Sequence, residues 1–276
     1  MLLLGEVVDQ LHGWYPPETA DEHDAVGLAY GDPAAEVRRV MFSVDISDEV
    51  AREAAEWDAD LLVTHHPLFL RPVHGVARTT PKGRTLAVLA EAGCGLLAAH
   101  TNADQAVDGV SESFALALGL TDLAPVEPAA SGEAATGSGR IGTVEPTTLA
   151  GFAARVAATL PATPVGVLVG GEADRPVGRV AVAGGAGDFL LDAVRRTDAD
   201  VYVTSDLRHH LAIEFLEHDG PALIQVSHWA AEWMWLPVVE AKLARALGDT
   251  VETYVSTICT DAWRHRLAQD TPRSTR

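Results

Sequence analysis

The sequence predicts an α/β protein made of two related β-α-β halves, with mainly parallel or mixed sheets and a metal site in the cleft between the halves. Three observations lead to this prediction. A segment from the first half of the chain recurs in the second half. In both halves, short apolar runs alternate with segments of helical periodicity. Several of these runs end in polar residues that can ligate metal, so each half presents such residues where its strands stop.

The internal repeat carries the most information. Residues Arg39–His66 align with Arg179–Asp206 at a constant offset of 140 without a gap, and 8 of the 28 aligned residues are identical. The identities include the Asp-Ala-Asp sequences that begin at Asp58 and Asp198. A composition rich in Ala, Val and Asp could produce some of these matches. The ungapped register over a whole unit nevertheless indicates two copies of one structural unit.

Both copies share the order strand, helix, strand. The sequence predicts these elements at Val40–Val44, Ser47–Trp57 and Leu61–Thr64, and again at Val180–Ala183, Asp188–Thr197 and Val201–Thr204. Each copy is followed by a further apolar run that ends in histidine, at Gly93–His100 and Gly220–His228. Apolar runs of this length between helices are typical of a parallel sheet covered on both faces.

The halves are separated by a segment of different composition. Ala124–Gly139 is rich in Ala, Gly, Ser, Pro and Glu, which predicts a flexible connection, and Thr147–Thr159 after it predicts a helix. The last residues lack apolar periodicity. We therefore expect a first α/β half at residues 1–123, the connection at 124–139, a second half at 140–268 and a disordered tail at 269–276.

Composition and charge exclude some classes of partner. The 276 residues include 20 Lys and Arg against 39 Asp and Glu, a net charge of −19, and this acidity disfavours nucleic acid as a partner. The N-terminus turns acidic too early for a signal peptide, and no apolar run is long enough to span a bilayer. We expect a cytoplasmic protein with no membrane partner. Cys94 and Cys259 have the pattern of small buried apolar residues rather than of a disulfide or metal site.

The first candidate for chemistry is the pair His65-His66, followed by Pro67. Neighbouring side chains on a strand point to opposite faces, so the two imidazoles converge only if the strand ends there and the backbone turns. Pro67 favours such a corner because it disfavours the helical conformation at His66. A single histidine at a strand end is more often structural, but two in tandem favour metal ligation.

Two further motifs follow apolar runs. His100 and Asp104 lie in HTNAD, which could equally be a turn whose Asn and Asp bond their own backbone. His228 and Glu232 share one face of a predicted helix at positions i and i+4. Such a pair is usually a surface contact, but the surrounding tryptophans favour burial, and a buried carboxylate needs a partner.

Taken together, the donors predict a site with two metal ions. The ligand set is His65, His66, Asp104, His228 and Glu232. Five such donors exceed what one four-coordinate zinc needs and suit two divalent ions that share a bridging ligand. Mixed histidine and carboxylate ligands favour Zn, Fe, Mn, Co or Ni over Mg or Ca.

A glycine-rich turn is a weaker candidate. Gly184-Gly185-Ala186-Gly187 follows a predicted strand and precedes a helix, a context in which backbone amides can bind phosphate. In the repeat it aligns with the plain turn at residues 44–47. A tight turn explains these glycines adequately.

Several motifs resemble the Nif-three-like dinuclear-metal family, whose bacterial members are called GTP cyclohydrolase 1 type 2 homologues. The motifs are HHPLF, HTNAD and SHWAAE followed by TYVSTICTD. The sequence DAVGL at Asp24 is similar to the family's DNVGL, with Ala25 replacing Asn, and TSDLRHH at Thr204 is similar to TGDLKYH, with Ser205 replacing Gly. The likeness extends from Leu3 to Asp261.

The resemblance implies a two-metal site on the five residues above and a toroidal homohexamer with its sites facing an inner cavity. The insertion of longer members is expected to be absent. Asp45, Asp206 and His210, at corresponding strand ends, become candidates for supporting a ligand or contacting substrate, with salt bridging or helix capping as the alternative.

Two functions remain open. The first is a metal-dependent hydrolase in which His100 or His210 moves protons. The resemblance implies GTP as its substrate and opening of the guanine imidazole ring with release of formate as its reaction. The second is a ring-shaped, non-enzymatic metal-binding scaffold or metal-handling protein.

Overall fold

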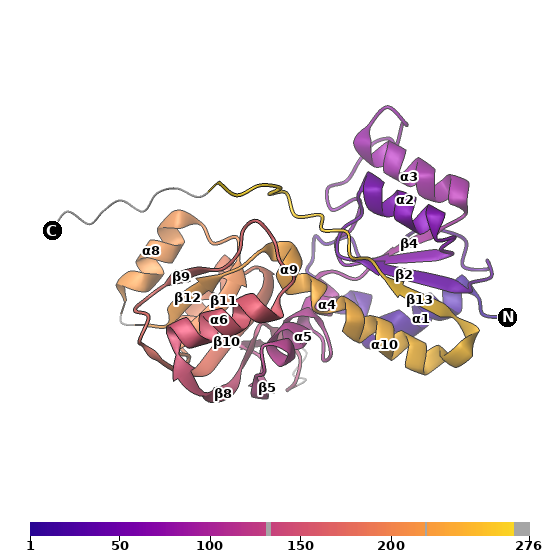
Figure 1. Cartoon of the computed structure of the whole chain (residues 1–276). Coiled ribbons are helices and arrows are strands. Elements are labelled where there is room, and N and C mark those ends of the chain that lie inside the picture. Colours follow the sequence, from indigo (N-terminus) through magenta and orange to yellow (C-terminus); the bar gives the residue numbers. More distant parts are fainter. Residues whose placement is uncertain (131–133, 219, 268–276) are drawn as a thin grey trace.

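The computed structural model describes residues 1–130, 134–218 and 220–267 and shows a mixed α/β protein built on two main sheets. Figure 1 shows the two sheets in separate layers, with α9 (His228–Trp233) between them. This confirms the predicted fold class of two α/β halves with mixed sheets.

The first sheet has five strands in the order β1-β4-β3-β2-β13. The strands are β1 (Gly27–Tyr30), β2 (Arg39–Ser43), β3 (Leu61–Thr64), β4 (Gly95–Ala98) and β13 (Glu252–Val255). All neighbouring pairs are parallel except β1 with β4. Strands β2, β3 and β4 are almost continuously apolar because both faces of the sheet are covered.

Helices cover the two faces of this sheet. Alternate strand residues such as Met41 and Leu62 pack with α2 (Asp48–Glu56) and α3 (Pro81–Ala92). The intervening residues pack with α1 (Leu4–Trp14) and α10 (Leu236–Leu247). Figure 1 shows α2 and α3 on one side of the sheet and α1 and α10 on the other.

The second sheet has six strands in the order β5-β8-β10-β11-β12-β9. The strands are β5 (Thr121–Ala124), β8 (Arg140–Thr148), β9 (Leu168–Gly170), β10 (Pro176–Ala186), β11 (Val201–Ser205) and β12 (Ala222–Gln225). Its centre, β10-β11-β12, is parallel, and the strands outside it pair antiparallel.

This second sheet is also covered on both faces. One face packs against α5 (Val110–Ala117), α6 (Leu149–Thr159) and α9. The other packs against η2 (Asp188–Leu190), α7 (Leu191–Arg195) and α8 (His209–Glu217). The remaining elements are η1 (Pro17–Thr19), α4 (Thr101–Gln105), β6 (Glu127–Pro128), β7 (Gly137–Ser138) and η3 (Gly248–Thr250).

The sequence repeat is also a repeat in structure. Val40 pairs with Leu61 between β2 and β3, and Val180 pairs with Val201 between β10 and β11, so the register is conserved at the same offset of 140. The elements agree closely with those predicted. The helix predicted at Asp188–Thr197 is divided between η2 and α7.

The sequence led us to expect a boundary between the two halves at residues 124–139. The two sheets are not divided at that place in the chain. Helix α5 and β5 come before that segment but pack with the second sheet, whereas β13 comes from the end of the chain and pairs with β2. An apolar strand pairs with whichever open sheet edge it reaches, regardless of its place in the chain. Within the described part of 124–139, β6 and β7 pair with each other, while residues 131–133 and the predicted tail at 269–276 lie outside the described residues.

None of the helices in the described ranges has the length and apolar character needed to cross a bilayer. Both cysteines are free, with Cys94 buried and Cys259 half-buried.

Candidate metal centre

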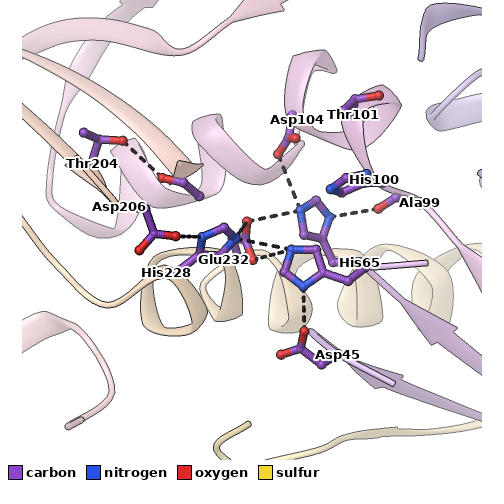
Figure 2. A network of polar contacts seen from close by, with 12 residues as sticks. Asp45, His65, Ala99, His100, Thr101, Asp104, Thr204, Asp206, His228 and Glu232 are labelled. Carbon is purple, nitrogen blue, oxygen red and sulfur yellow. Dashed lines mark hydrogen bonds and ion pairs between the residues drawn. The ribbon is translucent and has the colours of Figure 1, made fainter. Parts of the chain in front are cut away.

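Four histidines from three strand ends meet beside one buried glutamate. His65 and His66 follow β3, and His100 follows β4. His228 begins α9 directly after β12, and Glu232 lies one turn later on the same helix. The carboxyl ends of strands from both sheets therefore supply one cluster (Figure 2).

All four imidazoles use Nδ1 to bond a supporting acceptor. The Nδ1 of His65 lies 2.9 Å from the Ala99 carbonyl oxygen. The partners of the other three are carboxylates, at 2.7 Å from His66 to Asp45, 2.8 Å from His100 to Asp24 and 2.7 Å from His228 to Asp206. Because these acceptors have no proton to donate, Nδ1–H is the donor, and each Nε2 faces the cluster, where it can hold either a proton or a metal ion.

The free Nε2 atoms face one another and Glu232. His66 Nε2 lies 3.3 Å from His228 Nε2 and 3.2 Å from Glu232 Oε2. Glu232 Oε1 lies 2.8 Å from His228 Nε2 and 3.4 Å from His65 Nε2. Asp104, on α4, extends the cluster with Oδ1 at 3.7 Å from His65 Nε2. Lone pairs held this close repel unless a proton or a metal cation lies between them.

Three of these atoms are buried without a hydrogen-bond partner. They are His65 Nε2, Asp104 Oδ1 and Glu232 Oε2. Buried polar atoms are almost always paired, and here each unpaired atom is a good ligand for a transition metal. The donor set therefore fits a metal cation.

The titration behaviour of the cluster reflects the same crowding. Burial alone would raise the pKa of Glu232, but the charges of His66, His228 and His65 outweigh burial and hold that pKa well below its usual range. Burial raises the pKa of Asp104, and His65 offsets this only in part. The negative charge of Glu232 is thus balanced by the neighbouring imidazolium groups, whereas that of Asp104 is balanced only in part.

Two overlapping groups have the spacing of metal ligands. The donor atoms of His66, His228 and Glu232 lie within 4.8 Å of one another, and so do those of His65, His66 and His100. Asp104 contacts His65 and so belongs with the second group. The five predicted ligands are therefore brought together, with Glu232 between the two groups.

His100 lies at the cluster and is held by Asp24. Asp24 also accepts hydrogen bonds from the backbone amide and the hydroxyl of Thr101. Burial opposes this charge, but the bonds from His100 and Thr101 outweigh it and hold the pKa of Asp24 far below its usual range. His100 is thus an imidazole with a fixed orientation beside the donor set.

The glycine-rich turn approaches the cluster closely. Gly185 has φ +71°, and a Cβ there would lie 2.6 Å from Glu232 Oε1 and 3.4 Å from His228 Nε2. A Cβ on Gly187 would lie 2.0 Å from Thr204 Oγ1. The helices that follow the turn, η2 and α7, are short, so they offer little support for the phosphate-binding alternative. Close approach to Glu232 therefore explains Gly185, and close approach to Thr204 explains Gly187.

A cavity of about 430 Å³ opens onto the cluster between the two sheets. His100 and Asp104 contribute to its wall from the first sheet's side, and His228, Glu232 and the backbone of 183–186 from the second. Its acidic lining residues are Asp21, Asp104, Glu127 and Glu232. The site thus lies in the cleft between the halves.

The structure separates one predicted residue from the site. His210 is exposed on α8, where its ring contacts His209, and it does not line the cavity. In contrast, Asp45 and Asp206 support His66 and His228 directly.

The sequence did not predict a role for two residues that support the donors, Asp24 and Thr260. Asp24 lies in the DAVGL motif, whose likeness to the family's DNVGL is the signal that could have identified it. Thr260 lies in STICTD and donates its hydroxyl proton to Asp45.

Curated relatives match over nearly the whole chain. A protein from Streptomyces coelicolor called GTP cyclohydrolase 1 type 2 homolog is 43% identical over 270 residues, covering 96% of this chain and 95% of the relative. A protein of the same name from Mycobacterium tuberculosis is 33% identical, covering 97% of this chain and 98% of the relative. That alignment spans 375 positions, more than the 276 residues of this chain, so the relative contains residues with no counterpart here.

Solved structures share the fold. A Bacillus cereus protein related to NIF3 has a TM-score of 0.87 at 23% identity, covering 95% of this chain and 98% of that chain. Staphylococcus aureus protein SA1388 has a TM-score of 0.86 at 24% identity, covering 96% and 99%. The model of the Duf34/NIF3 (NGG1p interacting factor 3) family matches residues 2–262, and with this site and these relatives the chain belongs to that family.

Proposed function

We propose that the protein is a metal-dependent hydrolase that holds two divalent ions per chain, drawn from Zn, Fe, Mn, Co or Ni. His66 and His228 would hold one ion, His65 and Asp104 would hold the other, and Glu232, which contacts histidines of both groups, would contribute to both. The observation that carries this proposal is the set of three buried donor atoms without a hydrogen-bond partner at the meeting point of both sheets. Unpaired atoms of this kind are unfavourable in a folded core unless a cation binds them.

Different residues around the cluster have different roles in the proposed reaction. When bound, divalent ions would supply Lewis-acid chemistry, which lowers the pKa of water toward neutrality and polarises the bond under attack. The cavity of about 430 Å³ receives the substrate. His100, oriented by Asp24, moves a proton at Nε2 between the cavity and the leaving group. Gly185 and its neighbours form the opposite wall and allow Glu232 to approach.

The names of the relatives suggest GTP as the first substrate to test. The reaction to test is the one that the family resemblance implies, opening of the guanine imidazole ring with release of formate. We further propose that the chain acts in the cytoplasm as a homohexamer. Light scattering would then give about six times the chain mass of 29.2 kDa. A monomer would contradict the hexamer without affecting the metal site.

The first test is metal content. Elemental analysis of the purified protein is expected to give about two transition-metal equivalents per chain. Glu232→Gln should lose most of both, because Glu232 contacts both donor groups. Glu214→Gln, at an exposed position on α8, is the matched control and should retain them. Full retention in Glu232→Gln would remove Glu232 from the ligand set.

The second test is turnover of GTP and a panel of phosphoesters with each metal. His66→Ala should abolish turnover through loss of metal. His100→Gln should lower turnover by about a hundredfold or more while retaining metal, as expected for a general acid-base residue. A metal-loaded wild type with no turnover on any substrate would favour the non-enzymatic scaffold instead.

A further inference from the structure

A second cavity, of about 420 Å³, lies beside His66 between the beginnings of α2 and α3. His66 and Asp45 form part of its wall, so it reaches one of the donors described above. It shares no lining residue with the cavity that contains His100 and Glu232. The donor set therefore has a separate cavity on each of two sides.

The two cavities differ in charge. The first is lined by four carboxylates, with no Lys or Arg among its lining residues in the described ranges. The second is lined by Lys82 and Arg84 in addition to Asp45 and Asp48. In a chain of net charge −19, two basic side chains beside a metal-binding cluster are a feature that requires an explanation.

The carboxylates of the second cavity already have partners. Asp45 bonds His66 and accepts the Thr260 hydroxyl. Asp48 Oδ2 lies 3.0 Å from Arg52 Nε. Asp48 Oδ1 is buried without a partner, and it can accept a hydrogen bond from a hydroxyl.

The two basic side chains are not neutralised in this way. Within residues 1–130, 134–218 and 220–267, neither Lys82 nor Arg84 has a carboxylate at ion-pair distance. Lys82 Nζ lies 5.8 Å from the centre of the Phe69 ring, and Arg84 donates one hydrogen bond of 3.4 Å to the Thr79 carbonyl. The first turns of α2 and α3 line the same cavity and add the partial positive charge of two helix N-termini.

We propose that this second cavity is an oxyanion subsite, in which Lys82 and Arg84 bind the phosphate or carboxylate group of the substrate. Arg can bond an oxyanion through two N–H groups, and Lys supplies a mobile point charge. A protonated phosphate oxygen, or a hydroxyl beside a carboxylate, donates to Asp48 Oδ1. This assignment to a substrate rests on the proposed function, whereas oxyanion binding itself does not.

The test is binding of inorganic phosphate and, separately, of acetate, measured by calorimetry on metal-free and metal-loaded protein. The double variant Lys82→Gln/Arg84→Gln should bind the preferred anion at least about tenfold more weakly in both states, the loss expected for one charge-assisted hydrogen bond. The matched control is Arg78→Gln, which removes an exposed charge that pairs with Glu91 rather than lining the cavity. This control should bind like wild type.

Comparison of the two anions identifies the ligand chemistry. Tighter binding of phosphate assigns the subsite to phosphate-bearing substrates, and tighter binding of acetate assigns it to carboxylates. Equal affinity in wild type and double variant, or no binding of either anion by wild type, would overturn the subsite. Metal content measured on the same samples separates the two proposals. A wild type without metal contradicts the metal centre, while the metal-free titration still tests the subsite.

Discussion

At the scale of single residues, Gly185 sets how closely β10 approaches Glu232. Gly185 has φ +71°, and a Cβ there would lie only 2.6 Å from Glu232 Oε1, so the site has no room for a methyl group. We expect Gly185→Ala to displace Glu232 and lower metal affinity by about 10–100-fold, the usual effect of disturbing the support of a ligand. Competition with a chelator measures this.

Gly13→Ala is the control for that experiment, because a Cβ at Gly13 would meet nothing within 4 Å. It should leave metal affinity unchanged. If Gly185→Ala bound metal as tightly as Gly13→Ala, Glu232 would not depend on this glycine.

The charge of His228 makes metal binding depend on pH. Burial lowers the pKa of His228 in the metal-free protein, but the charge of Glu232 and the bond to Asp206 outweigh burial and raise it to about 10. Its contribution to stability is complete below the ordinary pKa of 6.5 and is lost as the pH rises through about 10. Metal must displace this proton, so metal affinity should rise with pH.

Calorimetry can test whether metal binding releases protons from the site. At pH 8, metal uptake in two buffers of different ionisation enthalpy should give different apparent enthalpies. Identical values in both buffers would show that no proton leaves the site.

At the scale of elements, one aspartate in each copy of the repeat joins the ends of two strands. Asp60 Oδ2 accepts from the amides of Arg38 and Arg39 at 2.7 and 2.9 Å. Asp200 Oδ2 accepts from Gly178 and Arg179, both at 2.8 Å. The acceptor and both donors in the second copy are each 140 positions after those in the first. Both copies of the repeat therefore share this pair of hydrogen bonds as well as the order of their strands.

We expect Asp60→Ala and Asp200→Ala each to lower the free energy of unfolding by about 1–3 kcal/mol, because two amides lose their acceptor. Asp198→Ala removes a carboxylate 78% exposed that only pairs with Arg179, and should cost less than about 1 kcal/mol. Denaturant unfolding measures all three. A loss in Asp198→Ala as large as in Asp200→Ala would show that surface charge, not the amide bonds, is responsible.

At the scale of the whole molecule, residues 256–261 connect the two layers beside the candidate metal centre. After β13 the chain runs from the first layer back toward the second (Figure 1). Thr260 donates to Asp45, which supports His66, and Asp261 accepts from Ser227, which caps α9. This segment therefore touches the supports of donors from both sheets.

We expect Thr260→Val to lower metal affinity about tenfold, since Asp45 loses one of its two partners. Thr260→Ser retains the hydroxyl and should restore the affinity. Thr257→Val makes the same substitution at an exposed position of the same segment and should have no effect. Metal titration checks the series, and equal loss in the Val and Ser variants would contradict a role for the hydroxyl.

Much of the site could be predicted because its residues follow strands that have a strong sequence pattern. His65, His66 and His228 come directly after apolar runs, and Glu232 follows His228 at helical spacing. HTNAD forms a short helix, α4, with Asp104 on it, and the alternative was correct in part, because the Asn102 side chain accepts a hydrogen bond from the His100 amide. Neighbouring parallel strands end at one edge, so these donors meet.

The sequence could not show contacts that depend on pairing between distant segments. Asp24 reaches His100 because β1 runs antiparallel to β4 with Gly27 opposite Ala98, and no periodicity records that register. The pairing of β13 with β2 joins residues more than 200 positions apart. For His210, proximity in sequence to the strand end at Ser205 was misleading, because α8 carries its side chain to the surface.

The return of β13 to the first sheet has a consequence for the order of biosynthesis. His65 and His66 leave the ribosome long before His228, Glu232 and β13 exist. At about 5–20 residues per second, the interval is roughly 10–40 s. Throughout that time the nascent chain has only part of its donor set and an open edge at β2. The complete donor set of the proposed metal site is therefore available only after Glu232 has been synthesised.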